Sequence, residues 1–158
     1  MNTSRSLALA ACALLGLARF AAAADAPPTE VKQFDHSRLE STFKTGAPGA
    51  LEVNSLYKVM VSRRVAPGAG EIHARDTDIF YIVDGSATFV TGGKAVDVTA
   101  LKQPDGSPSA IEFHFKSAEG GTEHHLQKGD SIIVPKGTPH QFTKIDGPFL
   151  YFVVKVTE

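Results

Sequence analysis

The stretch Gly129–His140 reads GDSIIVPKGTPH and is the main basis for predicting the fold. β-Branched residues at 132–134 lie between turn residues, and this pattern is typical of a short strand. Lys136-Gly137 predicts a tight turn, and Pro139 fixes the backbone immediately before His140. We therefore expect a strand and a rigid corner that hold one histidine in a fixed position, as a metal ligand requires.

This stretch resembles the second conserved motif of the cupin superfamily, G-x5-P-x-G-x2-H, and it matches that motif through His140. The asparagine that the motif has four residues later is replaced here by Lys144.

A segment upstream, Glu71 to Gly85, resembles the first cupin motif, G-x5-H-x-H-x3,4-E-x6-G, with departures. We match His73 with the first histidine, Arg75 with the second, and Asp78 with the glutamate. The spacing from the histidines to the acid is then shorter than usual.

Short strands separated by glycine, proline and aspartate clusters indicate an all-β fold. Among such folds, the resemblance selects a single-domain cupin jelly-roll β-barrel with a short N-terminal helix. We expect a surface loop at 101–108, near the mouth of the barrel. The strands are expected at 56–65, 79–83, 87–90, 111–115, 124–126, 131–134 and 150–156.

Residues 1–24 are predicted to be a secretory signal peptide. Arg5 precedes an apolar run at 7–17, and alanines at 21–24 offer a cleavage site. The run is shorter than the ~20 residues that cross a bilayer. We therefore expect a periplasmic or secreted protein without a membrane partner after cleavage. A lipobox-like sequence ending at Cys12 leaves a lipid anchor open as an alternative.

Residues 25–50 are expected to form a tether and a short helix, and residues 51–158 the barrel. The helix is predicted at 38–45, where Leu39 and Phe43 lie four residues apart and would pack onto the barrel.

The composition excludes several classes of function. Removal of Arg5 and Arg19 with the signal peptide changes the formal net charge from −1 to −3, and no basic run remains. A nucleic-acid partner is therefore not expected. Cys12 is the only cysteine, so the cleaved chain would have neither a disulfide nor a cysteine-based catalytic or zinc site.

His73 and His140 are the best candidates for metal ligands, because neutral imidazoles on different strands suit Mn, Fe, Ni, Cu or Zn. The alternative is that they are hydrogen-bonded histidines of a cupin that has lost its metal. Asp78 is the candidate third ligand. Strand alternation places it out of phase with His73 unless the chain bulges between them. Asp76 is a weaker candidate for the same role.

Arg75 is predicted to face the same side as His73 if the strand is unbroken. It would then hold a carboxylate or phosphate of an anionic small-molecule ligand. The alternative is an ion pair with Asp76 or Asp78.

Two further residues are candidates for substrate binding. His124 is in phase with Leu126 on the strand that leads into the second motif, so we expect it to line the cavity; a surface position is the alternative. Tyr81 lies within the segment that resembles the first motif, with core packing as its alternative.

The resemblance implies two functions and one kind of assembly. The first function is a metal-dependent enzyme of oxygenase, isomerase or lyase type, acting on a small organic acid or sugar-like ligand. The second is a non-catalytic cupin that binds or senses a small molecule. The last strand is apolar on both faces at 149–154, and jelly-roll sheets have edges to cover, so we expect a homodimer.

Overall fold

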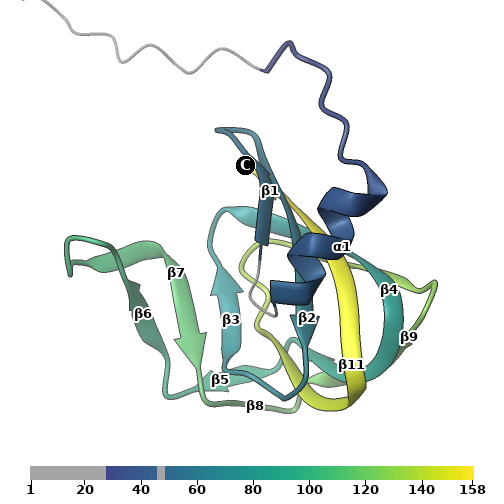
Figure 1. Ribbon diagram of the computed structural model, residues 1–158. Coiled ribbons are helices and arrows are strands. Elements are labelled where there is room, and N and C mark those ends of the chain that lie inside the picture. Colours follow the sequence, from purple (N-terminus) through teal and green to yellow (C-terminus); the bar gives the residue numbers. More distant parts are fainter. Residues whose placement is uncertain (1–27, 46–48) are drawn as a thin grey trace, which may run out of the picture.

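The computed structural model describes residues 28–45 and 49–158. The expected signal peptide and Cys12 lie outside these residues. The described part contains one helix and eleven strands, which confirms the predicted all-β fold with a short helix near its start (Figure 1). In chain order these are α1 (His36–Thr45), β1 (Gly49–Val53), β2 (Tyr57–Arg64), β3 (Gly70–His73), β4 (Asp76–Thr91), β5 (Lys94–Val96), β6 (Thr99–Lys102), β7 (Pro108–Phe115), β8 (Ser117–Glu119), β9 (Thr122–Gln127), β10 (Ser131–Val134) and β11 (His140–Thr157).

The two longest strands, β4 and β11, pair antiparallel and hold the fold together. β4 also pairs with β9 and β10, and β11 continues a series in the order β1-β2-β11-β3-β7-β6. β5 and β8 form a separate two-stranded sheet. Hydrogen bonds between the described strands do not close the nine-stranded sheet into a complete barrel. It forms a jelly-roll sandwich whose two faces enclose the core.

A bend at Gly85 lets both halves of β4 direct side chains into the interior. Gly85 has φ +80°, and a Cβ atom at this position would lie 2.3 Å from the carbonyl oxygen of Pro148. Glycine is therefore required here for both its conformation and its size. The inward-facing positions change parity across the bend, from Phe80 before it to Phe89 after it.

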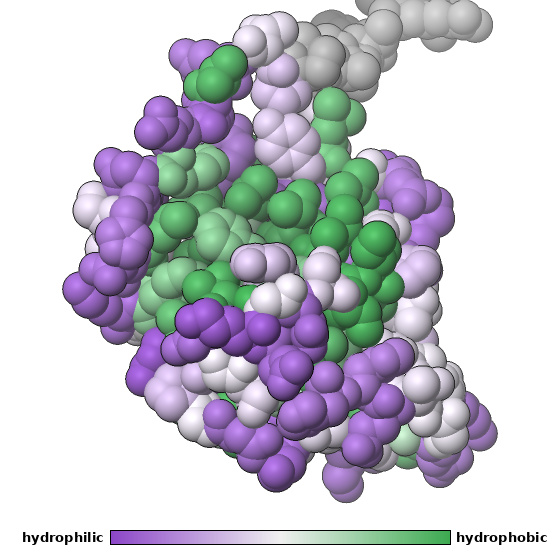
Figure 2. All heavy atoms as spheres, turned by 90° about the vertical axis from the view of Figure 1, so that its right-hand side faces the viewer, coloured by the Kyte–Doolittle hydropathy of each residue, from purple (hydrophilic) through white to green (hydrophobic). Residues whose placement is uncertain are grey.

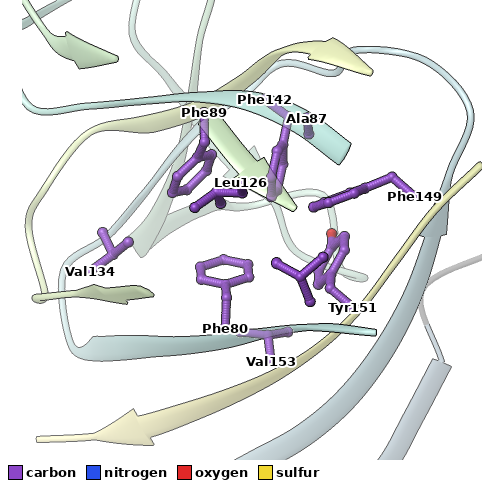
Figure 3. Packing of buried hydrophobic residues seen from close by; sticks show 10 residues of the cluster. Phe80, Ala87, Phe89, Leu126, Val134, Phe142, Phe149, Tyr151 and Val153 are labelled. Carbon is purple, nitrogen blue, oxygen red and sulfur yellow. The ribbon is translucent and has the colours of Figure 1, made fainter. Parts of the chain in front are cut away.

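An aromatic core fills one end of the interior. It consists of Phe80, Phe89, Phe142, Phe149 and Tyr151, all buried (Figure 3). The rings of Phe89 and Phe142 have their centroids 4.4 Å apart, and Phe80 meets Phe142 edge-on at 5.9 Å. Along these strands, side chains that face the interior alternate with side chains that face outward.

Helix α1 begins with a side-chain cap, because Asp35 Oδ1 accepts a hydrogen bond from the backbone N–H of Arg38 at 2.8 Å. The helix begins at His36, two residues earlier than predicted, and ends at Thr45 as predicted. Phe43 is buried and packs edge-on against Phe152 of β11, with ring centroids 6.3 Å apart. The predicted packing of the helix onto the sheet is thus confirmed for Phe43.

The expected loop at 101–108 is shorter than predicted. Thr99–Lys102 is strand β6 and pairs with β7, so only the turn at 103–107 separates the two strands. The hairpin of β6 and β7 extends to the left in Figure 1. Within residues 28–45 and 49–158, no helix is long and apolar enough to cross a membrane.

Candidate metal centre

The turn before β11 fixes the position and the tautomer of His140. Gly137 has φ +76°, and its N–H donates to the carbonyl of His73 at 2.7 Å, so the turn is fastened to the end of β3. The Nδ1 of His140 lies 3.0 Å from the carbonyl oxygen of Thr138. A carbonyl oxygen only accepts hydrogen bonds, so Nδ1 carries the proton and the buried Nε2 presents a bare lone pair to the interior.

His73 ends β3 and is oriented from the neighbouring strand. In the pairing of β3 with β7, His73 lies opposite Glu112, whose carboxylate makes a short hydrogen bond with Nδ1. This leaves Nε2 directed into the interior, where the ring centroid lies 5.1 Å from that of His140.

Glu71, two residues before His73 on β3, completes the group. One ligand atom from each of Glu71, His73 and His140 can be chosen so that all lie within 4.8 Å of one another. His73 Nε2 lies 3.4 Å from Glu71 Oε2 and 3.5 Å from Asp78 Oδ2, and His140 Nε2 lies 3.8 Å from that same oxygen of Asp78. These four side chains are called the donor cluster below.

The donor cluster fits a divalent transition metal ion. Atoms that bind one ion at about 2.1 Å stand roughly 3–3.5 Å apart. The separations of His73 Nε2 from Glu71 and Asp78 lie in this range, and the other donors need only a small inward movement. Two buried atoms of the cluster, His140 Nε2 and Asp78 Oδ1, have no hydrogen-bond partner. Unsatisfied buried polar atoms are costly, and a metal ion would satisfy them.

Burial and neighbouring charges set the protonation of the cluster. Burial lowers the pKa of His140, which keeps that ring neutral. Burial would raise the pKa of Glu71, but the hydrogen bond with His73 and nearby cations lower it to about 2. Burial would likewise lower the pKa of His73, yet its hydrogen bonds with Glu112 and Glu71 raise it to about 9.

Lys155 of β11 reaches into the middle of the donor cluster and was not predicted. Its Nζ lies 2.7 Å from His73 Nε2 and 2.6 Å from Asp78 Oδ2. The sequence did contain a signal, since positions 149, 151 and 153 of the same strand are all buried and position 155 shares their parity.

A cavity of about 160 Å³ adjoins the donor cluster. Glu71, Asp78, His140 and Lys155 form part of its wall, and the aromatic core forms another part. Arg64 of β2 also lines it, with its Nε donating to the hydroxyl of Tyr151 at 2.9 Å. The cavity can therefore hold a small molecule in contact with both the donor cluster and a guanidinium group.

The sequence profile of the cupin family matches residues 41–158. The chain belongs to the cupin family. Solved structures agree with this fold, although their low identity means that they show the fold alone.

This cupin is similar to the protein TT1209 from Thermus thermophilus, with 14% identity, 80% of this chain and 98% of that chain covered, and a TM-score of 0.54. It is also similar to BH2720 from Bacillus halodurans, with 14% identity, 80% and 83% covered, and a TM-score of 0.53. For the DMSP lyase DddQ from Ruegeria pomeroyi the identity is 19% and the TM-score 0.49; the match covers 71% of this chain and 47% of the lyase. No relative was found among curated protein sequences.

The structure changes how the first cupin motif is matched. Glu71 and His73 both face the interior from β3, as the two histidines of an H-x-H pair would. His73 therefore takes the second histidine position, and Glu71 replaces the first. Four residues then separate His73 from Asp78, and six separate Asp78 from Gly85, which is the family's ordinary spacing.

Arg75 does not point into this cupin with His73, contrary to our expectation. The strand is broken at 74–75, so the alternation on which that expectation depended does not continue. Arg75 is exposed, and its Nε donates to the backbone carbonyl of Glu158 at 3.1 Å. The alternative ion pairs are not formed either, because Asp76 pairs with Lys58 and Asp78 with Lys155.

Tyr81 is 52% exposed and faces outward from β4, so neither pocket lining nor core packing describes it. His124 is half-buried and its Nε2 lies 2.8 Å from the hydroxyl of Thr91, a contact between β9 and β4 rather than with the donor cluster. Asp76, the weaker candidate for the third ligand, is buried, but its carboxylate contacts Lys58 and Thr157.

Proposed function

We propose that this cupin binds a divalent transition metal ion (Mn, Fe, Ni, Cu or Zn) through Glu71, His73, His140 and Asp78, and acts on a small organic acid in the adjoining cavity. Bound there, such an ion would act as a Lewis acid or as an activator of oxygen, which is the chemistry of oxygenase, isomerase or lyase reactions. The observation that carries the proposal is the pair of buried, unpartnered atoms, His140 Nε2 and Asp78 Oδ1, within one cluster of donors.

The charges around the cavity favour an anionic ligand. Arg64 lies with its guanidinium carbon 5.2 Å above the ring of Phe142, which restrains the side chain. One of its terminal nitrogens lies 3.6 Å from Glu71 Oε1. If Glu71 binds a metal, it no longer neutralises Arg64. The guanidinium group can then hold a carboxylate of the ligand in two hydrogen bonds. Arg64 thus takes the role that we had expected of Arg75.

Metal content tests the proposal. The wild-type protein, purified without added metal and then dialysed against a mixture of the five ions, should retain close to one ion per chain. His140→Gln removes one donor yet can still donate to the Thr138 carbonyl, so it should retain far less metal with its β-sheet circular dichroism unchanged. His125→Gln is the matched control, because His125 is an exposed residue of β9. Equal metal in both variants would contradict the proposal.

A second function is supported by Lys155. Its ammonium group already neutralises Asp78 and bonds to His73, so the cavity is also consistent with a cupin that binds a small molecule without metal and without catalysis. Retention of an anionic ligand by metal-stripped protein, with an unchanged dissociation constant, would favour this second function.

We also propose that the chain is exported to the periplasm or beyond after loss of residues 1–24. The sequence pattern of those residues supports this. N-terminal sequencing of the mature protein should begin near Asp25. A mature chain that begins with an acylated Cys12 would contradict both the cleavage site and the absence of a membrane partner.

We further propose a homodimer formed through the outer face of the sheet. Ile133, Ile79, Val154 and Val59 lie side by side in register across β10, β4, β11 and β2, and all four face outward. Figure 2 shows hydrophobic side chains gathered at the centre of one face with hydrophilic residues around them. Helix α1 covers the part of the sheet around Phe152 and leaves Ile133 62% exposed.

Light scattering at tens of micromolar should give the mass of two chains. Ile133→Lys should yield monomers, because a charge in the middle of an apolar interface is costly. Val98→Lys is the control, since Val98 is also exposed but lies outside the β10-β4-β11-β2 sheet. A wild-type monomer would contradict this proposal.

A further inference from the structure

Lys155 occupies the place that a metal ion in the donor cluster would need. In the register of β11 with β4, Lys155 lies directly opposite Asp78, so the two side chains extend inward as a cross-strand pair. The Nζ of Lys155 is within 2.7 Å of both His73 Nε2 and Asp78 Oδ2. Only 12% of the Lys155 side chain and 2% of the Asp78 side chain is exposed to solvent.

The hydrogen bond to His73 excludes a metal ion from the same atom. Nδ1 of His73 is engaged with Glu112, so Nε2 is the ring nitrogen that remains for the interior. A neutral imidazole has one accepting nitrogen. While Lys155 Nζ lies 2.7 Å from Nε2, that nitrogen either accepts from the ammonium group or carries the proton that the raised pKa of His73 favours, and in neither state can His73 be a metal ligand.

Electrostatic repulsion also prevents a metal ion from binding while Lys155 is in place. Asp78 is buried, and a buried carboxylate needs a cation close by. Lys155 supplies that cation when no metal is bound. A divalent ion would supply it as well, but an ammonium group at hydrogen-bond distance from two of its ligands would repel it strongly in a site with little water. The donor cluster therefore holds either the ammonium group of Lys155 or a metal ion, and not both.

We propose that Lys155 is a built-in competitor for the metal site: its ammonium group fills the donor cluster in the metal-free protein, and it must leave before His73 and Asp78 can bind an ion. This inference rests on the proposed metal-binding function. It assigns the control of metal affinity to Lys155, a residue that lies in neither of the two cupin motifs. The displaced ammonium group, like Arg64, then faces the cavity as a second positive charge for an anionic ligand.

The test compares the affinities of metal-stripped variants for Zn²⁺ and Mn²⁺, measured by titration against a chelating dye. Lys155→Met removes the competing charge and should tighten binding about ten- to a hundredfold, the range that a charge-assisted hydrogen bond represents in an equilibrium constant. Lys155→Gln should tighten binding as well, and its amide can still bond to Asp78 if the Met variant folds poorly. Lys128→Met is the control, because Lys128 pairs with Asp84 on the surface, away from the donor cluster; the metal affinity of this variant should change far less.

A second measurement uses the wild-type protein and does not depend on variants that fold. Lys155 should react slowly with an amine-specific acylating reagent in metal-stripped protein and faster in metal-saturated protein, as quantified by mass spectrometry of the peptide that contains it. Lys144, whose side chain is 67% exposed, serves as the internal reference and should react at one rate in both states.

The outcomes separate this inference from the proposed function. Unchanged or weaker binding by both Lys155 variants, with metal bound by the wild type, overturns the inference and leaves the metal-binding function standing. Binding by Lys155→Met but not by the wild type supports the inference and removes the metal-dependent function. No binding by any of the three proteins overturns both. Identical acylation of Lys155 with and without saturating metal also overturns the inference.

Discussion

The two ends of the interior of this cupin are stabilised in opposite ways. The aromatic core consists of uncharged rings that contact one another, with the guanidinium group of Arg64 at its edge, whereas the donor cluster gathers two carboxylates and two imidazoles around one ammonium group. Both ends are built on the same strands: β4 contributes Phe80 and Asp78, and β11 contributes Tyr151 and Lys155. The sheet thus carries the stability at one end and the chemistry at the other, two residues apart along β4 and four residues apart along β11.

This comparison predicts that the largest losses of stability arise in the aromatic core. Phe89→Ala should lower the free energy of unfolding by roughly 3–5 kcal/mol, because Phe89 is fully buried and its removal leaves a cavity. Urea denaturation measures the change. A loss below about 1 kcal/mol would mean that the core can collapse around the missing ring and that it is not the main source of stability.

The next largest effect is expected at Lys155 in the absence of metal. Lys155→Met leaves the buried Asp78 carboxylate without its cation, and should cost about 2–3 kcal/mol in metal-stripped protein. Adding Asp78→Asn to the same chain should restore most of that loss, since the buried charge is then gone. If the double variant is as unstable as the single one, Lys155 contributes by packing rather than by neutralising Asp78.

A smaller loss is expected at Gly137, in the turn that holds His140. Gly137→Ala meets no atom within 4 Å, so its cost is that of the positive φ alone, about 1 kcal/mol. Because the turn fixes the histidine, metal affinity should fall even under conditions in which this loss of stability leaves the protein folded. Thermal melts beside a metal titration would show this separation, and a variant with unaltered metal affinity would mean that the turn does not position the ligand.

The smallest effects are expected at Arg75, which lies outside the cavity. Arg75→Lys should change stability by less than about 0.5 kcal/mol and should leave ligand binding unchanged. Arg64→Lys, the same substitution inside the cavity, should weaken binding of small mono- and dicarboxylates, because lysine lacks the planar fork. Calorimetric titration of both variants with the same carboxylates measures the two effects. Equal effects on binding would mean that Arg64 is not part of the ligand site.

The sequence allowed the fold and part of the site to be predicted, and the reasons differ by residue. His140 was placed correctly because the residues that form its turn lie within twelve consecutive positions, although the hydrogen bond from Gly137 to His73 also fastens the turn to β3. Arg75 was placed wrongly because the break at 74–75 depends on hydrogen bonds made elsewhere, such as that from the N–H of Ala74 to the carbonyl of Ile111. Because of that break, the residue that faces the interior beside His73 is Glu71 and not Arg75.

The remaining residues of the site come from long-range pairing. Glu112 lies opposite His73 because β7 pairs with β3, and no local pattern marks that register. Lys155 is different, because the alternation of apolar residues along β11 places it inside and only its charge argued for the surface. Charge alone therefore does not place a lysine at the surface when it is in phase with buried aromatic residues.

The most direct test of the central claim is a crystal structure of this cupin soaked with Mn²⁺ or Zn²⁺, with anomalous scattering recorded at the absorption edge of the ion. We expect one strong anomalous peak within bonding distance of His73 Nε2, His140 Nε2 and a carboxylate oxygen of Glu71, with Lys155 Nζ moved away from His73. A structure at saturating metal that has no peak in the donor cluster, and in which Lys155 still bonds to both His73 and Asp78, would contradict the claim.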